Sequence, residues 1–259
     1  LEQISNATNN IYCWLKIDTG MNRLGIKIND VANAISRLES LGVLSDIGLM
    51  THLSDAEDRL SKKNDIQLNL FRDLTDNFSG DISFANSAVI INYDKLIKKF
   101  KWNNKGSIWI RPGISLYGIS PLSDKSAAQL NLKPVMQFIS KLIAIKPILK
   151  GETVGYNSTW AAKRNTTLGV ISVGYGDGYS KSLISGTQIM INNRKVPLVG
   201  LVSMDLVTVD LGKDAKDLIG DEVILWGDKL PIEEIADHSG LLTYSLVTGV
   251  TERVKRHIQ

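Results

Sequence analysis

Ile11-Tyr12-Cys13-Trp14-Leu15-Lys16-Ile17 is an apolar, aromatic and β-branched run, and Asp18-Thr19-Gly20 ends it, so the stretch predicts a β-strand. The next segment predicts a helix, because apolar residues recur at helical spacing between a polar cap and a glycine. Those apolar residues are Ile28, Val31, Ile35, Leu38 and Leu41, the cap is Asn29 with Asp30, and Gly42 follows.

The same alternation of strand and helix continues to about residue 120. Further strands are predicted at 47–53, 82–85 and 107–110, with helices between them over 60–78 and 95–100. Such alternation favours a parallel sheet with helices outside. Four of these units make half of an eight-stranded barrel, and a half barrel leaves two edges unpaired. We therefore expect a chain that lacks the front of its barrel, as its first residue, leucine, also suggests.

From about residue 122 the pattern changes to apolar runs without helical spacing. Strands are predicted at 135–149, 166–173, 187–191, 196–210 and 222–226, with a hairpin turn at Asn192-Asn193 and a short helix over 231–236. The predicted fold is α/β plus β: the second half of a (β/α)8 barrel in residues 1–124, followed by a mostly β C-terminal domain in residues 125–259.

Composition excludes several classes of partner. The 259 residues are 43% hydrophobic and carry a formal net charge of +3, too even a balance to favour nucleic acid or an anionic membrane. A single cysteine, Cys13, rules out an intrachain disulfide and fits a cytoplasmic location. No apolar run reaches the length of a membrane span, and no signal segment opens the sequence.

Polar side chains follow each predicted strand of the first half, and in a parallel barrel these strand ends are where active sites form. They are Arg23, His52, Asn86 with Ser87, and Arg111.

A glycine-rich stretch, Ser172-Val173-Gly174-Tyr175-Gly176-Asp177-Gly178-Tyr179, ends the strand predicted at 166–173. Glycines allow a sharp turn and a close approach of the backbone to another group. Tyr175 between them is either a packed rim residue or an acid or base directed into a site. Taken alone, the pattern favours packing, because short motifs match often by chance.

Five stretches in order resemble the alanine racemase family, and the resemblance covers residues from about 11 to Arg256. They are Lys16–Gly25 (KIDTGMNRLG), Thr51-His52-Leu53, Ile110–Gly118 (IRPGISLYG), Gly174–Tyr179 (GYGDGY) and Val202–Asp205 (VSMD). The resemblance implies an eight-stranded barrel followed by a β domain, in a head-to-tail homodimer with sites shared between subunits. The family's cofactor lysine lies in a Lys-Ala-Tyr-Gly context that this sequence lacks. We therefore expect the N-terminal part with that lysine to be absent from this chain.

The activity implied is interconversion of L-alanine and D-alanine with pyridoxal 5'-phosphate, which supplies D-alanine for peptidoglycan. Tyr175 resembles the base for the L-enantiomer, and the missing lysine would serve the D-enantiomer. A tyrosine has an ordinary pKa of about 10 and needs a positive neighbourhood to act as a base. His52 and Arg111 are suitable neighbours. Tyr179 is the alternative base, although we expect it to pack.

The cofactor residues implied by the resemblance come mainly from the first half. Arg111 resembles the arginine that faces the pyridine nitrogen, where a permanent cation would keep that nitrogen unprotonated and weaken the electron sink. Ser87, Gly113, Ile114 and Tyr244 resemble the phosphate cradle, with Asn86 and His52 beside it. Without the resemblance, Asn86-Ser87 would be interpreted as a helix cap.

The substrate residues implied are Arg23, Lys16 and Met204. Arg23 resembles the arginine that reaches the substrate carboxylate, and Lys16 a lysine that is carbamylated in some members, with a rim lysine as the alternative. Met204 resembles the residue whose backbone meets substrate from the partner subunit. Leu201 and Ser245 stand where the family usually has arginine and glutamate.

Two alternatives remain open. Without its second base, this chain alone could be a catalytically inert fragment that serves only as a folding or dimerisation module. A related decarboxylase would need a cysteine in the C-terminal part, whereas Cys13 lies at the other end.

Overall fold

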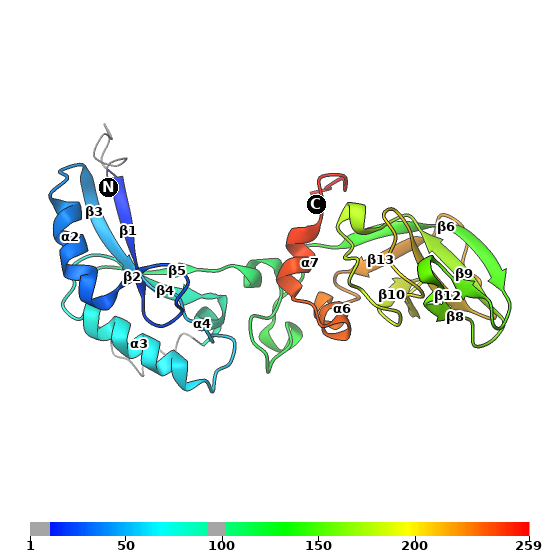
Figure 1. Ribbon diagram of the computed structural model, residues 1–259, viewed down its shortest axis with the longest axis horizontal. Coiled ribbons are helices and arrows are strands. Elements are labelled where there is room, and N and C mark those ends of the chain that lie inside the picture. The colour runs from blue at the N-terminus through cyan, green and yellow to red at the C-terminus, as the bar shows by residue number, and fades with distance from the viewer. Residues whose placement is uncertain (1–10, 93–101, 259) are drawn as a thin grey trace. The chain divides into compact units, whose positions relative to one another are not determined.

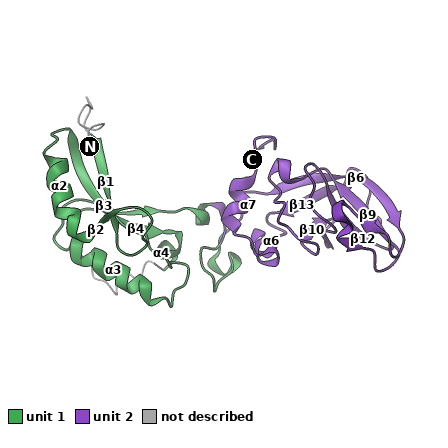
Figure 2. Cartoon of the chain, viewed as in Figure 1, with its two compact units in different colours: residues 1–116, 120–132 green, residues 117–119, 133–259 purple. Residues whose placement is uncertain are grey.

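The structure is a computed structural model that describes residues 11–92 and 102–258. The chain forms two compact units (Figure 1, Figure 2). Unit 1 comprises residues 1–116 and 120–132, and unit 2 comprises residues 117–119 and 133–259. None of the helices in the described ranges has the length and apolar character needed to cross a membrane.

Unit 1 is built on a parallel sheet, as the alternating pattern predicts. The strands are β1 (Ile11–Asp18), β2 (Ile26–Lys27), β3 (Leu44–Met50), β4 (Ile82–Asn86) and β5 (Ile108–Arg111), in the order β2-β1-β3-β4-β5. Every neighbouring pair is parallel. Four of these strands were predicted, while β2 is too short to leave a pattern in the sequence.

The helices of unit 1 depart from the prediction mainly at their ends. They are α2 (Val31–Glu39), α3 (Lys62–Thr75) and α4 (Ser87–Ile91), with 3-10 turns at Ile28–Asp30, Ile114–Tyr117 and Ala128–Leu130. The predicted cap of α2 is wrong, because the Asp30 side chain makes no capping hydrogen bond. The helix predicted over 60–78 is shorter, since Asn77 adopts a left-handed φ of 67°. The helix predicted over 95–100 lies outside the described residues.

One face of the parallel sheet packs against the helices. Ile17 of β1, Leu49 of β3 and Phe84 of β4 join Leu68 and Phe71 of α3 in a buried cluster. Successive side chains of a strand point to opposite faces. Lys16 therefore shares the other face with Tyr12 and Trp14, whose rings contact each other at 5.6 Å.

The turn after β1 is organised by one carboxylate. Asp18 Oδ1 accepts from the backbone N–H groups of Gly20 (3.1 Å) and Asn22 (2.9 Å), and Asp18 Oδ2 accepts from Lys27 Nζ at 2.8 Å. Lys27 belongs to β2 and pairs in register with Asp18. These contacts lower the Asp18 pKa to about 2, with the Lys27 bond as the largest cause. The turn that carries Arg23 is thus closed at both ends.

Unit 2 is built on a six-stranded sheet in the order β11-β10-β13-β6-β9-β12. Each neighbouring pair of strands in this sheet is antiparallel. The strands are β6 (Phe138–Ile148), β9 (Thr166–Ile171), β10 (Gln188–Ile191), β11 (Arg194–Pro197), β12 (Val207–Gly212) and β13 (Glu222–Trp226), with a small pair β7 (Thr153–Val154) and β8 (Trp160–Ala161). The mostly β prediction is confirmed. So is the hairpin turn, where Asn192 and Asn193 both have positive φ, 49° and 60°.

Several features of unit 2 were not predicted from the sequence, among them the pair β7 and β8. The strand predicted over 196–210 is two strands, because the Ser203 and Met204 carbonyls accept from another loop instead of a strand. The short helix extends further, as α6 (Ile232–Ser239), and a second helix follows, α7 (Thr243–Gly249). The core includes Trp226, whose ring stacks on Tyr179 and meets Phe138 edge-on.

Asp18→Asn should lower the urea stability of the protein at neutral pH, because an amide cannot form the ion pair with Lys27. Since the folded pKa of Asp18 is about 2 against an ordinary 3.8, its stabilisation is present above the ordinary value and lost as pH falls toward 2. The difference between the urea midpoints of variant and wild type should therefore be much larger at neutral pH than at pH about 2.

Asp30→Asn is the matched control, because the Asp30 side chain does not cap α2. A midpoint difference for Asp18→Asn that is equally large at both pH values would contradict this explanation.

Candidate active site

Arg111, at the end of β5, is held by oxygen atoms from the start of β4 and from the residue that follows β3. Its guanidinium donates to Ser83 Oγ on β4 and, at 2.7 Å, to the carbonyl of Thr51 just beyond β3. Half-burial lowers the Arg111 pKa by desolvation. Both acceptors are neutral, so the positive charge of Arg111 is not cancelled by them and remains available to a ligand.

His52 lies beside this guanidinium, with its Nδ1 3.4 Å from Arg111 Nη2. Burial lowers the His52 pKa, and the charges of Arg111, Arg23 and Lys16 lower it further, in that order. The imidazole is therefore neutral near pH 7, with Nδ1 able to accept from Arg111. Three cations around a neutral ring make this strand edge attractive to anions.

Ser87 Oγ is the shared acceptor of a second cluster of hydrogen bonds at the same edge of the sheet. It accepts from the N–H of Gly113 (2.8 Å), from the N–H of Ser115 (3.3 Å) and from Ser115 Oγ (3.1 Å). Ser87 is only 4% exposed and Ile114 only 3%, so the turn is anchored. A Cβ on Gly113 would point at Ser87 Oγ from 3.8 Å, so the absent side chain leaves space over this hydroxyl.

Asn86 has the capping role that its sequence pattern favours. Its side chain accepts from the N–H of Val89 at 3.1 Å and begins α4. It thereby sets the position of Ser87 at the first turn of this helix.

These residues fit a phosphorylated cofactor such as pyridoxal phosphate. Backbone N–H groups and hydroxyls are the donors that bind phosphate in loops, and Ser87, Gly113 and Ser115 carry such groups, which here bond to one another. Ser115 was missed as a site residue, although it lies one position beyond Ile114 in the quoted motif. Ser83 and Thr51 were also missed, because nothing in the sequence indicates that they hold Arg111.

In unit 2, Tyr175 sits on a loop that packs backbone to backbone against Ser203 and Met204. Tyr175 N–H donates to the Ser203 carbonyl (3.0 Å), and Gly176 N–H to the Met204 carbonyl (2.8 Å). A Cβ on Gly174 would lie 2.2 Å from the Met204 carbonyl oxygen, so glycine is required there. Tyr175 and Met204 are therefore positioned together, with 39% and 53% of each residue exposed.

Arg253 contacts a carboxylate on each of these two segments, the Tyr175 loop and the segment of Ser203 and Met204. Its Nη2 donates to Asp205 Oδ1 at 2.6 Å, and its Nε lies 3.5 Å from Asp177 Oδ1. Asp177 Oδ2 in turn accepts from Gly174 N–H at 3.0 Å. The hydrogen bond to Asp205 is the largest cause that raises the Arg253 pKa. Arg253 was not identified from the sequence, since it follows the last of the quoted motifs.

The other two tyrosines of interest differ sharply in burial. Tyr179 is 0% exposed, and desolvation raises its pKa far above the ordinary value, which suits packing and not proton transfer. Tyr244 lies on α7 and is 51% exposed. In place of the expected glutamate, Ser245 donates to the carbonyl of Leu242 at 2.7 Å.

The expected site residues thus form two groups, one in each unit. Unit 1 brings together Lys16, Arg23, His52 and Arg111, with Ser87, Gly113 and Ile114 at the same strand edge. Unit 2 brings together Tyr175 and Met204, and it also carries Tyr244.

Family models match both parts of the chain. The model described as "Alanine racemase, N-terminal domain" matches residues 1–121, and the model described as "Alanine racemase, C-terminal domain" matches residues 135–258. The N-terminal domain is therefore represented, and this match does not support the expectation that the N-terminal part with the cofactor lysine is absent.

Individual relatives agree with the family models. Alanine racemase of Mannheimia succiniciproducens is 45% identical over 250 residues, which are 96% of this chain and 67% of the relative. Alanine racemase of Pasteurella multocida is 47% identical over 251 residues, with the same shares. The crystal structure of biosynthetic alanine racemase from Pseudomonas aeruginosa matches with a TM-score of 0.88 at 37% identity, covering 97% of this chain and 68% of that one.

The chain spans about two thirds of the length of these relatives. Its architecture, an N-terminal β/α unit followed by a C-terminal β unit, is the one that its structural neighbours share. By sequence, by domain order and by fold, the chain belongs to the alanine racemase family.

Proposed function

We propose that the chain is part of an enzyme that interconverts L-alanine and D-alanine with pyridoxal 5'-phosphate. The observation that carries the proposal is Arg111, held by neutral oxygens beside a neutral His52 and close to a hydroxyl-rich turn. The relatives are named alanine racemases, which gives the reaction and the substrate class.

The cofactor would supply an electron sink for the substrate's α-carbon. Ser87, Gly113 and Ile114 would hold its phosphate, and the family resemblance adds Tyr244 to these residues. Arg111 would face its ring nitrogen. The lowered pKa of His52 keeps the imidazole neutral, so it can accept from Arg111 and orient it.

Substrate binding would rest on the cations at the ends of β1 and β5. Arg23 would meet the alanine carboxylate, and Lys16 as a carbamate would position Arg23. The alternative is an ordinary rim lysine without that role. Tyr175 would remove the α-proton of L-alanine, because its loop presents the side chain partly exposed while the backbone is fixed on Ser203 and Met204.

The remaining parts of the proposal rest on the family. They are a homodimer in which Met204 reaches the partner's substrate, a cytoplasmic location, and supply of D-alanine for peptidoglycan. We also propose that unit 1 is the second half of an eight-stranded barrel, since it has parallel strands with helices packed on one face.

The second base of the proposed mechanism is a lysine in a Lys-Ala-Tyr-Gly context, which these 259 residues lack. We propose that it is not among residues 1–259. This absence also supports the alternative for the chain by itself, a folding and dimerisation module without catalysis.

Tyr175→Phe in the complete enzyme should reduce racemisation of L-alanine by roughly 10²–10⁴-fold, the usual effect of a positioned general base. Tyr156→Phe, which changes another exposed tyrosine of unit 2, serves as the control and should retain full activity. Conversion measured by chiral chromatography decides the matter, and normal turnover in Tyr175→Phe would refute the assignment.

Ser87→Ala should weaken pyridoxal phosphate binding roughly tenfold or more, because a hydrogen bond to a charged group is lost. Binding is measured by fluorescence titration of the complete enzyme. Ser61→Ala removes a hydroxyl of unit 1 that bonds Asp55 instead, and it should bind like the wild type. Equal affinities in the wild type and both variants would contradict the assignment of Ser87 to the phosphate site.

Borohydride reduction tests the position of the second base. A protein of residues 1–259, with a mass of 28.5 kDa, should show no stoichiometric pyridoxyl adduct on a single lysine after treatment with pyridoxal phosphate. Intact mass and peptide mapping give the answer. One lysine modified in full would place the base within this chain.

A further inference from the structure

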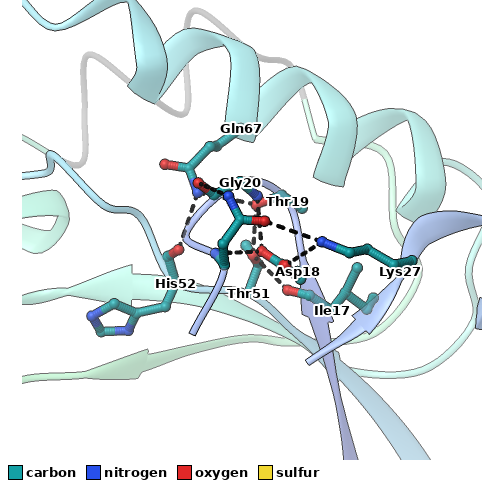
Figure 3. A network of polar contacts seen from close by, with 9 residues as sticks. Ile17, Asp18, Thr19, Gly20, Lys27, Thr51, His52 and Gln67 are labelled. Atoms are coloured by element: carbon teal, nitrogen blue, oxygen red, sulfur yellow. Dashed lines mark hydrogen bonds and ion pairs between the residues drawn. The ribbon is translucent and has the colours of Figure 1, made fainter. Parts of the chain in front are cut away.

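A buried polar network joins the ends of β1 and β3 to helix α3 (Figure 3). Gln67 of α3 donates through Nε2 to the carbonyl of His52 at 3.2 Å and to Thr19 Oγ1 at 3.4 Å. Its Oε1 accepts from the N–H (2.9 Å) and the hydroxyl (3.0 Å) of Ser54. Two donors and two acceptor sites are all that an amide has, so this side chain is fully used.

The hydroxyls of Thr19 and Thr51 continue the hydrogen bonds of Gln67, and the donor of each bond can be assigned. Thr51 Oγ1 donates its proton to the carbonyl of Ile17 at 3.0 Å. The 2.8 Å contact between the two threonine hydroxyls must then be donated by Thr19. Thr19 Oγ1 is left as an acceptor, which Gln67 satisfies. The order is Gln67 to Thr19 to Thr51 to Ile17, from the helix to β1.

The network is buried, so its loss would be costly. Gln67 is 2% exposed, Thr19 4% and Thr51 1%. An unsatisfied buried polar group costs about 1–3 kcal/mol. Gly20 packs against this amide with a φ of +134°, which favours glycine, and a Cβ there would contact Gln67 Cγ at 3.4 Å.

Two of the three residues that Gln67 contacts, His52 and Thr19, lead to members of the candidate site. His52 is bonded through its main chain, and Figure 3 shows its ring extending away from Gln67. Thr51, next in the network, accepts from Arg111 through its carbonyl. Thr19 begins the turn that carries Arg23, four residues further on.

We propose that Gln67 is a positioning residue: it holds the main chain at the ends of β1 and β3 so that His52, Arg111 and Arg23 converge on one ligand. Gln67 does not reach the ligand itself, because it lies behind the strand ends on the α3 side. The inference deepens the proposed function and rests on it only for the identity of that ligand.

The test compares two buried amides of α3 in the full chain. Gln67→Met keeps the length of the side chain but removes its hydrogen bonds. Asn64→Leu is the control, because Asn64 donates to the carbonyls of Asp55 (3.0 Å) and Asp58 (2.8 Å) in the loop before α3 and not to a strand end. Both variants should lower the melting temperature.

The first measurement is the titration of His52 by NMR without any ligand. The charges that act on its ring are those of Arg111, Arg23 and Lys16. In Gln67→Met the ring should move away from them and from its buried position, so the His52 pKa should rise toward the ordinary value of about 6.5. Asn64→Leu should leave that pKa where it is in the wild type.

The second measurement is the affinity for pyridoxal phosphate in the complete enzyme, which should fall roughly tenfold in Gln67→Met and stay unchanged in Asn64→Leu. If Gln67→Met lowers only the melting temperature and moves neither the His52 titration nor the affinity, the role is structural and the proposal is overturned.

If Gln67→Met does not fold, Gln67→Glu takes its place, since it keeps an acceptor for Ser54 but loses both N–H donors. The same outcomes then apply. Because the His52 titration needs no ligand, it still tests Gln67 should the protein prove not to bind pyridoxal phosphate.

Discussion

The hydrogen bonds from the Arg111 guanidinium to Ser83 and to the Thr51 carbonyl organise the candidate site of unit 1. They join the ends of β3 and β5 and the start of β4 through one side chain, and they use neutral acceptors, so the cation keeps its charge. His52 stays neutral beside it, since burial and positive neighbours lower its pKa. The parallel sheet makes this possible, because the carboxyl ends of its strands lie along one edge.

The candidate site of unit 2 depends on a different constraint, the close approach of two backbones. Gly174 and Gly176 allow the Tyr175 loop to bond the carbonyls of Ser203 and Met204, and Arg253 ties the flanking carboxylates together. The tyrosine side chain is left partly exposed by a rigid loop. A catalytic side chain needs this combination of a fixed backbone and an accessible tip.

The sequence predicted much of the fold, because strands and helices leave local patterns. Alternating apolar runs located β1, β3, β4 and β5, and paired asparagines located the hairpin between β10 and β11. Prediction from the sequence failed where a segment's hydrogen-bond partners are distant along the chain. The run over 196–210 has the composition of one strand, yet Ser203 and Met204 bond the Tyr175 loop and divide it. The helix cap was also predicted wrongly. Asp30 is a residue type that often caps helices, but its side chain makes no capping hydrogen bond here.

The sequence by itself determined the class of the fold, the family, and the identity of the residues expected at the site, because motifs record residue type and order. Only the tertiary structure decided which groups hold those residues. Ser83, Thr51, Gln67 and Arg253 carry no local signal, since each acts on atoms 15 or more residues away in sequence. Their roles arise when strand ends, a helix and a loop are brought within hydrogen-bond distance, and a linear pattern does not encode that distance.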